Sequence, residues 1–197
     1  MLAALQNRDD AQSAPFVADE IETSRLRLRM FAPEDLDDLC VIASDPEVMR
    51  FIGRGLPLTR EETLLNLTSI INAFRRRGFG RWALVRKDTG ALVGYCGLSF
   101  GSEEVGVELA YMLSRGEWGQ GLATEAARAC LRYGFERLGL SSIAALTRPE
   151  NFRSRGVMEH LGMTYVWAGH HFGYSCVCYS IARGDWQPDG SVYRVIR

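Results

Sequence analysis

The sequence lacks the features that define several large classes of protein. No apolar run approaches the roughly 20 residues that a membrane-spanning helix needs, and residues 1–20 are charged and without a long apolar core. We therefore expect neither a membrane span nor a signal peptide. The formal net charge is only −1, which does not favour a protein that coats nucleic acid or another polyanion. The expected protein is cytoplasmic, with no membrane or nucleic-acid partner.

Cysteine and histidine are also sparse. The five cysteines are scattered, odd in number and contain no C-x-x-C spacing, which disfavours a disulfide framework or zinc site and favours reduced thiols. The adjacent His170 and His171 suggest a metal, but no third ligand is spaced to complete a site, so we predict no metal. We expect this pair in a loop between the last two strands, either solvated or in contact with a substrate.

The chain has 197 residues, which is enough for one domain with a sizeable core. Residues 1–20 have no hydrophobic period and are predicted to form a flexible N-terminal arm. No repeat, low-complexity tract or linker follows, so residues 21–197 are predicted to form a single domain.

Hydrophobic spacing and end signals predict helices and strands along this domain. Thr59 and Glu62, for example, form a capping box that begins a helix, and Gly78 ends it. The expected helices cover residues 33–44, 59–78, 121–139 and 151–161. The expected strands cover residues 25–30, 81–86, 91–100, 105–113, 142–146, 163–167 and 176–182. Short turns favour antiparallel pairing and the strand–helix–strand unit at 105–146 adds a parallel pair, so we predict an α/β (α+β) fold with a mixed sheet and helices on its faces.

One segment between a predicted strand and a predicted helix is the most informative for function. It reads Trp118-Gly119-Gln120-Gly121-Leu122-Ala123-Thr124-Glu125-Ala126. Two glycines let the backbone turn tightly, and the free amides of the loop and of the first helical turn form an anion site. The spacing fits neither G-x-G-x-x-G, whose third glycine is replaced by Thr124, nor a G-K-[ST] loop. The segment is either a phosphate cradle or a simple turn before a helix.

Further motifs in the same order resemble the Gcn5-related N-acetyltransferase (GNAT) superfamily, in its RimJ/RimL-like branch. That branch shows an acidic residue on a strand, then W-G-x-G-[YL]-A-T-E-A, then a P-E-N-x-x-S helix that ends in L-G-[FM]. This chain has the strand at 108–113, the glycine segment above, Pro149-Glu150-Asn151 with Ser154, and Leu161-Gly162-Met163. The resemblance runs from about residue 21 to Trp186. Trp118 and Ala123 depart from the superfamily's general pattern but are usual in this branch.

The resemblance implies a GNAT fold with about seven strands splayed in the middle, and acetyl-CoA as co-substrate. The coenzyme arm and thioester would pair with the backbone of Tyr111, Met112 and Leu113. Asn151 and Ser154 would lie along the arm near the sulfur. The pyrophosphate would be held by the residues of the glycine segment, namely Gly119, Gln120, Gly121, Leu122, Ala123 and Thr124.

Acyl transfer to an amine needs a neutral amine and benefits from a proton for the leaving thiolate. Glu108 is the candidate base or water-positioning group, with a structural carboxylate paired to an arginine as the alternative. Tyr111 either binds substrate or packs as a strand aromatic. Many superfamily members carry a tyrosine that acts as the general acid at a position that is Met158 here. Ser154 is then the nearest hydroxyl, and its alternatives are helix capping or a passive contact, with solvent as the proton source.

The acceptor is left open by the sequence. The resemblance implies a protein N-terminal α-amine or a small-molecule amine, in a pocket near residues 51–53 and 170–174, and a homodimer is possible. Residues 50–87 hold nine basic and two acidic residues, which either attract an acidic acceptor or are solvated arginines. A non-catalytic acyl-CoA-binding or sensing module is the alternative function.

Overall fold

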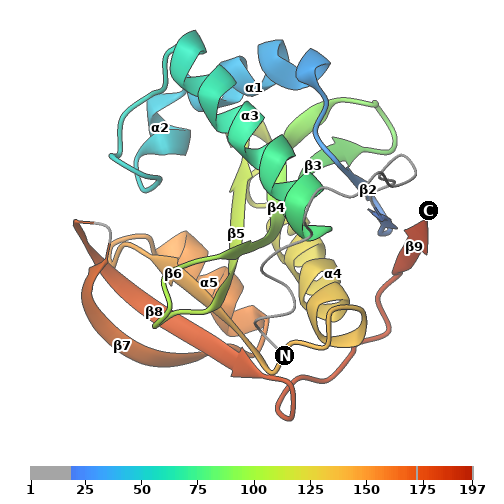
Figure 1. The fold of residues 1–197 in the computed structure, drawn as a ribbon, viewed down its shortest axis with the longest axis vertical. Coiled ribbons are helices and arrows are strands. Elements are labelled where there is room, and N and C mark those ends of the chain that lie inside the picture. The colour runs from blue at the N-terminus through green and yellow to red at the C-terminus, as the bar shows by residue number, and fades with distance from the viewer. Residues whose placement is uncertain (1–18, 172, 197) are drawn as a thin grey trace.

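The computed structural model describes residues 19–171 and 173–196, so residues 1–18 of the arm expected at 1–20 lie outside the described residues. The last two residues of that stretch are not part of a flexible arm: the Asp19 carbonyl accepts from Trp82 Nε1, and Glu20 begins the first strand and pairs with Ile196. The described chain forms one nine-stranded sheet in the order β7-β8-β6-β5-β4-β3-β2-β1-β9 (Figure 1). All neighbouring strands are antiparallel except β5 and β6. The predicted mixed, mostly antiparallel sheet with helices on both faces is therefore confirmed. Among the described helices, none is both long and apolar enough to cross a bilayer.

The elements follow the chain in this order: β1 (Glu20–Glu22), β2 (Leu26–Arg29), a 3-10 turn η2 (Pro33–Asp35), α1 (Leu36–Ala43), α2 (Pro46–Met49), α3 (Arg60–Arg77), β3 (Arg81–Arg86), β4 (Leu92–Phe100), β5 (Val107–Leu113), η3 (Arg115–Glu117), α4 (Leu122–Glu136), β6 (Ser142–Thr147), α5 (Phe152–His160), β7 (Thr164–His171), β8 (Tyr174–Ala182) and β9 (Arg194–Ile196).

Local signals explain where the best-predicted elements begin and end. The Thr59 hydroxyl accepts from the Glu62 amide while the Glu62 carboxylate accepts from the Thr59 amide, which is the predicted capping box of α3. Gly78 ends α3 in a left-handed conformation with φ of +78°. Arg81–Arg86 forms β3 over the predicted residues.

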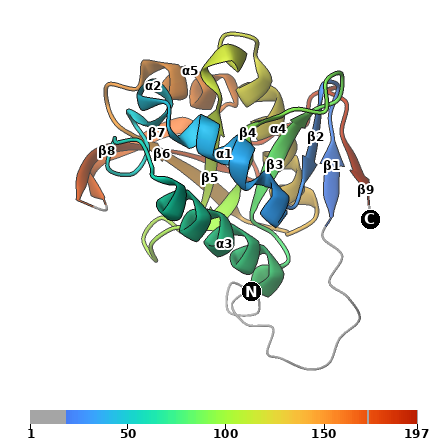
Figure 2. The ribbon, with the colours of Figure 1, turned by 90° about the horizontal axis from the view of Figure 1, so that it is seen from above.

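The helices cover the two faces of the sheet and enclose two cores (Figure 2). On one face α1, α2 and α3 pack against the sheet through residues such as Leu39 and Leu67. On the other face α4 and α5 contribute Leu122, Ala126 and Met158 to the larger core. Successive residues of β5 alternate between the cores, so Leu109 belongs to the α4 side and Met112 to the α1–α3 side.

The sheet separates between its two parallel strands. β4 and β5 pair from Gly94–Leu113 to Phe100–Val107 along their whole length, whereas β5 and β6 register only at Glu108 and Ala144. The edge of β5 beyond Glu108 is therefore not covered by β6. This is the splayed centre that the family resemblance implied.

Several elements differ from the sequence-based expectation. The sheet has nine strands rather than about seven, because β1 and β9, from the two ends of the described chain, pair with each other. Pro46 begins the short helix α2, with Asp45 as its cap, after α1 has ended. The prediction of a loop at His170 and His171 is wrong: both lie in β7, which pairs with β8 as far as His171–Tyr174.

Candidate active site

A cleft of about 2240 Å³ lies where β5 and β6 separate. Its lining combines β5, the glycine segment, the first turn of α4, the start of α5 and the loop at 50–53. The structure therefore brings the three separate sequence motifs together around one space. All the residues predicted to bind the coenzyme or to act in catalysis line this cleft except Gln120.

The glycine segment presents unpaired backbone donors to the cleft. Gly119 and Gly121 have φ of +75° and +76°, a left-handed conformation that glycine adopts without strain. Within the described chain, the amide N–H groups of residues 119–124 have no protein acceptor, and the first helical amide bonded to this segment is that of Glu125, to Gly121 O. Free N–H groups at the positive end of α4 form a site that fits a pyrophosphate.

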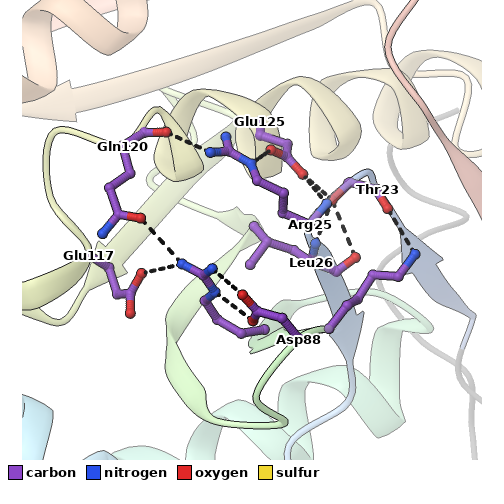
Figure 3. A network of polar contacts seen from close by, with 9 residues as sticks. Thr23, Arg25, Leu26, Asp88, Glu117, Gln120 and Glu125 are labelled. Atoms are coloured by element: carbon purple, nitrogen blue, oxygen red, sulfur yellow. Dashed lines mark hydrogen bonds and ion pairs between the residues drawn. The ribbon is translucent and has the colours of Figure 1, made fainter.

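Arg25 links this segment to α4 (Figure 3). Its Nη1 donates to the backbone oxygen of Gln120 at 2.8 Å and its Nε donates to Glu125 of α4 at 2.6 Å. Glu125 also accepts from the Thr23 hydroxyl at 2.6 Å. Burial alone would raise the pKa of Glu125, but the bonds from Thr23 and Arg25 outweigh it and lower this pKa below its usual value.

A second arginine supports the other end of the segment. Arg86 of β3 forms ion pairs with Asp88 and with Glu117, and its Nη1 lies 3.3 Å from the side-chain oxygen of Gln120 (Figure 3). The Gln120 amide nitrogen donates to Gly116 O. The Gln120 side chain is thus occupied by hydrogen bonds to the protein. The group of Gln120 that is available to an anion is its backbone amide.

Tyr111 and Ser154 meet on the α4–α5 side of the cleft. The Tyr111 hydroxyl lies 2.8 Å from Ser154 Oγ and donates to the Ser154 carbonyl at 3.0 Å. Burial raises the pKa of Tyr111 and keeps the phenol protonated. The structure therefore places the two candidate hydroxyls together, from β5 and from the first turn of α5.

Asn151 caps α5. Its side-chain oxygen accepts from the Ser154 amide at 3.2 Å and its nitrogen donates to Thr147 Oγ1 at 3.0 Å. Helix capping, one of the alternatives for Ser154, is therefore the role of Asn151. The Leu113 carbonyl accepts from Trp118 Nε1 at 2.9 Å, so this carbonyl already has a partner.

Glu108 faces the other side of the sheet from Tyr111, toward α1–α3. Its carboxylate lies 3.5 Å from Ser99 Oγ, and among the described residues it forms no ion pair with an arginine. Burial raises the pKa of Cys178, and the nearby Glu108 charge raises it further, which places this carboxylate near β8. The alternative role of Glu108, a structural carboxylate paired with an arginine, is therefore not found among the described residues.

Met158 occupies α5 one turn beyond Ser154 and is 1% exposed in the core. It contributes packing and has no acidic proton. Tyr111 reaches the preceding turn of the same helix, so a phenol is present near this position although it comes from another element.

The α1–α3 side of the cleft is lined by Phe51, Ile52 and Gly53, as expected, and also by His171 and Tyr174. His170 is exposed, with Nε2 3.5 Å from Ser175 Oγ. Two further lining residues, Arg81 and Arg148, were not singled out from the sequence. Neither residue belongs to a motif. The only sequence signals for their positions are the alternating faces of strand β3, which begins with Arg81, and the end of strand β6, which Arg148 follows.

Comparisons with known proteins identify the class of this site. A family profile described as "Acetyltransferase (GNAT) domain" matches residues 25–164. The uncharacterized N-acetyltransferase p20 of Bacillus licheniformis is 36% identical over 141 residues, which cover 71% of this chain and 79% of that protein. A solved structure of a GNAT-family acetyltransferase from Bacillus anthracis is 27% identical, with a TM-score of 0.73, and covers 84% of this chain and 99% of that chain.

The structure of RimL, a ribosomal L7/L12 alpha-N-protein acetyltransferase in complex with coenzyme A, shares the fold. Its TM-score is 0.68 at 16% identity, over 81% of this chain and 95% of that one. The present chain belongs to the GNAT acetyltransferase family. It is an acyltransferase, and acetyl-CoA is the acetyl donor that this family uses.

Proposed function

We propose that the protein transfers the acetyl group of acetyl-CoA to a primary amine by direct attack within a ternary complex. The acceptor is a small-molecule amine or a protein N-terminal α-amine. The observation that carries the proposal is the two-sided cleft. Free amides and the Tyr111–Ser154 pair face one side of the splayed strands, and Glu108 faces the other.

The coenzyme side is supported by the backbone. We assign the pyrophosphate to the amides of Gly119, Gln120, Gly121, Leu122, Ala123 and Thr124. The uncovered edge of β5 at Tyr111, Met112 and Leu113 would pair with the pantetheine arm, with Asn151 and Ser154 beside it. The Leu113 carbonyl is bonded to Trp118, so the pairing of Leu113 would use its N–H or a shared acceptor.

On the acceptor side, Glu108 would take the proton from the attacking amine, directly or through one water. An α-amino group has a pKa near 7.7–8.0 and needs little help, whereas a lysine-like amine near 10.4 needs about 3–4 kcal/mol more at neutral pH. A single carboxylate is therefore better suited to the α-amine than to the lysine-like amine.

On the donor side, the amine nitrogen attacks the thioester carbonyl carbon, the C–S bond breaks, and the sulfur leaves with the electron pair. Ser154 would donate its hydroxyl proton to this thiolate. Tyr111 can then pass its own proton from the Ser154 carbonyl to Ser154 Oγ, because both acceptors lie within hydrogen-bond distance of the phenol. The proton that Glu108 took from the amine would return through solvent to the phenol when the products leave, which restores both groups.

Thermal unfolding with and without nucleotides tests the coenzyme assignment. Acetyl-CoA should raise the melting temperature, since a ligand that binds only the folded state stabilises it, while ATP and NAD should do little. Equal shifts from all three would indicate nonspecific anion binding. A thiol-release assay with amines, polyamines, aminoglycosides and peptides then tests turnover, and amine-dependent CoA release is the expected result.

A further inference from the structure

The arginines of the cleft divide into paired and unpaired groups. Seven arginines line it: Arg25, Arg50, Arg81, Arg115, Arg128, Arg148 and Arg153. Four of them form ion pairs with the acidic residues Glu125, Glu47, Asp45 and Asp189. Among the described residues, the other three have no carboxylate partner. Arg153 is on the coenzyme side, where it stacks over Trp118, and this leaves Arg81 and Arg148 for the acceptor side.

Arg148 follows the last residue of β6 and faces the space opened by the splay. Its guanidinium carbon lies 4.6 Å from the centre of the Tyr174 ring, and Nη2 donates to Gly53 O at 2.9 Å. A guanidinium has five N–H donors, so the Gly53 bond leaves most of them available. Tyr174 and Gly53 therefore orient Arg148 without neutralising its charge.

Arg81 approaches the same space from the opposite side of β5. In the sheet, Arg81 of β3 lies opposite Gly97 of β4, and Gly97 lies opposite Ala110 of β5, which lines the cleft. Because Gly97 has no side chain, no side chain of β4 stands between Arg81 and Ala110. The guanidinium carbon lies 5.4 Å from the centre of the Tyr95 ring. A ring face orients an arginine but supplies no counter-charge.

Glu108 completes this arrangement. It is the acidic residue on the acceptor side of β5 that forms no ion pair in the described chain. Burial raises the pKa of Cys176, the Arg148 charge lowers it and the Glu108 charge raises it, so one thiol lies within the field of both groups. Among the described residues, one acid and two arginines without ion-pair partners thus line one open cleft.

We propose that the acceptor amine carries an anionic group, which Arg148 binds in the field of Arg81 while the amine faces Glu108. This inference rests on the proposed acetyltransferase function and specifies its acceptor. Arg148 lies four residues beyond Ala144, the partner of Glu108, which is roughly 13 Å along a strand. The two side chains shorten this distance, so the amine and the anion should be separated by roughly 5–10 Å. A side-chain carboxylate on the amine-bearing residue, or an acidic residue next to a peptide N-terminus, fits this spacing.

Matched acceptor pairs test the charge alone. Glutamic acid α-amide and glutamine α-amide share the same α-amine and differ in one side-chain charge. Octapeptides that begin Ser-Glu and Ser-Gln provide the same comparison for a polypeptide acceptor. For at least one pair, kcat/KM for CoA release should favour the acidic member by about tenfold or more, as expected for a charge-assisted contact. The pair that shows the preference identifies a free or a peptide acceptor.

Variants then assign the preference to residues. Arg148→Gln and Arg81→Gln should each reduce the acid-to-amide ratio, the former more, and Arg148→Glu should invert it, so that glutamine α-amide becomes the better acceptor. Arg60→Gln is the matched control, because Arg60 pairs with Asp37 outside the cleft and its loss should leave the ratio unchanged. Arg148→Lys keeps the positive charge but changes the group that contacts Gly53 O, so it separates the effect of the charge from the effect of that contact. The melting shift with acetyl-CoA reports that each variant is folded.

The outcomes separate this inference from the proposed function. Turnover of neutral amines equal to or faster than that of their acidic partners would overturn the inference and leave the acetyltransferase intact. An acid preference that persists in both Arg81→Gln and Arg148→Gln would also overturn it. Absence of CoA release with every amine, despite a melting shift, would instead contradict the proposed catalytic function.

Discussion

The hydroxyl oxygens of Tyr111 and Ser154 lie 2.8 Å apart, although the two residues are 43 positions apart in the chain. The phenol proton goes to the Ser154 carbonyl, so the Ser154 hydroxyl is free to act either as donor to the phenol or as donor to a thiolate in the cleft. We propose that these two weak acids in contact move a proton as a unit, in place of the single tyrosine that the family resemblance implies at the position of Met158.

Replacing Tyr111 by phenylalanine removes the phenol oxygen while keeping the ring in the core. We expect kcat to fall by about tenfold or more with little change in KM for acetyl-CoA, because a proton donor acts in the transition state rather than in binding. Steady-state kinetics measure this split. A rise in KM at constant kcat would assign Tyr111 to binding alone.

Ser154→Ala tests whether the pair acts together. If both hydroxyls belong to one donor, the double variant should lose about as much kcat as the worse single variant. Effects that add would mean that the two hydroxyls act separately. Melting temperatures of all three variants show how much of the change is structural, since Asn151 rather than Ser154 caps the helix.

Glu108→Gln keeps the size of the side chain and removes its charge. We expect kcat to fall about 100-fold or more, the usual range for loss of a general base, while the affinity for acetyl-CoA is retained. Glu104→Gln, at an exposed position outside the cleft, serves as the control. Kinetics like those of the wild type in Glu108→Gln would place the base elsewhere.

Elements with local signals could be predicted from the sequence, and elements that depend on distant pairing could not. The helix α3 has a capping box and a glycine terminator, and both ends agree with the structure. The strand β9 has no signal of its own and exists because Arg194, Val195 and Ile196 pair with β1. Strand β7 extends through His170 and His171 because its partner β8 continues to Tyr174, whereas polar residues in sequence favour a loop.

The site shows the same division. The glycine segment is local, so its position before α4 and its two left-handed glycines follow from the residues themselves. The contacts that support it are not local: Arg25 reaches Glu125 across 100 positions. Likewise, whether Arg81 and Arg148 have ion-pair partners depends on where acidic residues lie in the folded chain. Residue spacing in the sequence does not predict this.

The phosphate cradle is tested by two substitutions at Gly121 whose side chains have nearly the same shape but differ in charge. Gly121→Asp adds a negative charge among the free amides and should abolish the melting shift with acetyl-CoA. Gly121→Asn has nearly the same shape, and asparagine tolerates the left-handed conformation better than most residues, so it should keep part of the shift. Gly184→Asp, an exposed glycine with open space around it, is the control. An unchanged shift in Gly121→Asp would remove the cradle from this segment.

The Arg25–Glu125 pair makes stability depend on pH in a stated direction. The pKa of Glu125 is lowered on folding, so its contribution is complete above the usual glutamate pKa of about 4.3 and is lost as the pH falls through the lower folded-state pKa. Because the Arg25 side chain is 42% exposed and that of Glu125 only 14%, we expect Glu125→Gln to destabilise the protein by about 1–2 kcal/mol at neutral pH. It should also weaken acetyl-CoA binding, since Arg25 would hold Gln120 less firmly.

Melting curves of wild type and Glu125→Gln between about pH 7 and pH 3 measure this difference, which should shrink in acid. Glu136→Gln is the matched control on the same helix, because Glu136 pairs with Arg132 on the surface and is far from the cradle. Its stability change should be smaller and its acetyl-CoA affinity unchanged. A difference between wild type and Glu125→Gln that stays constant down to pH 3 would show that the ionised Glu125 carboxylate is not what ties α4 to residues 23–25.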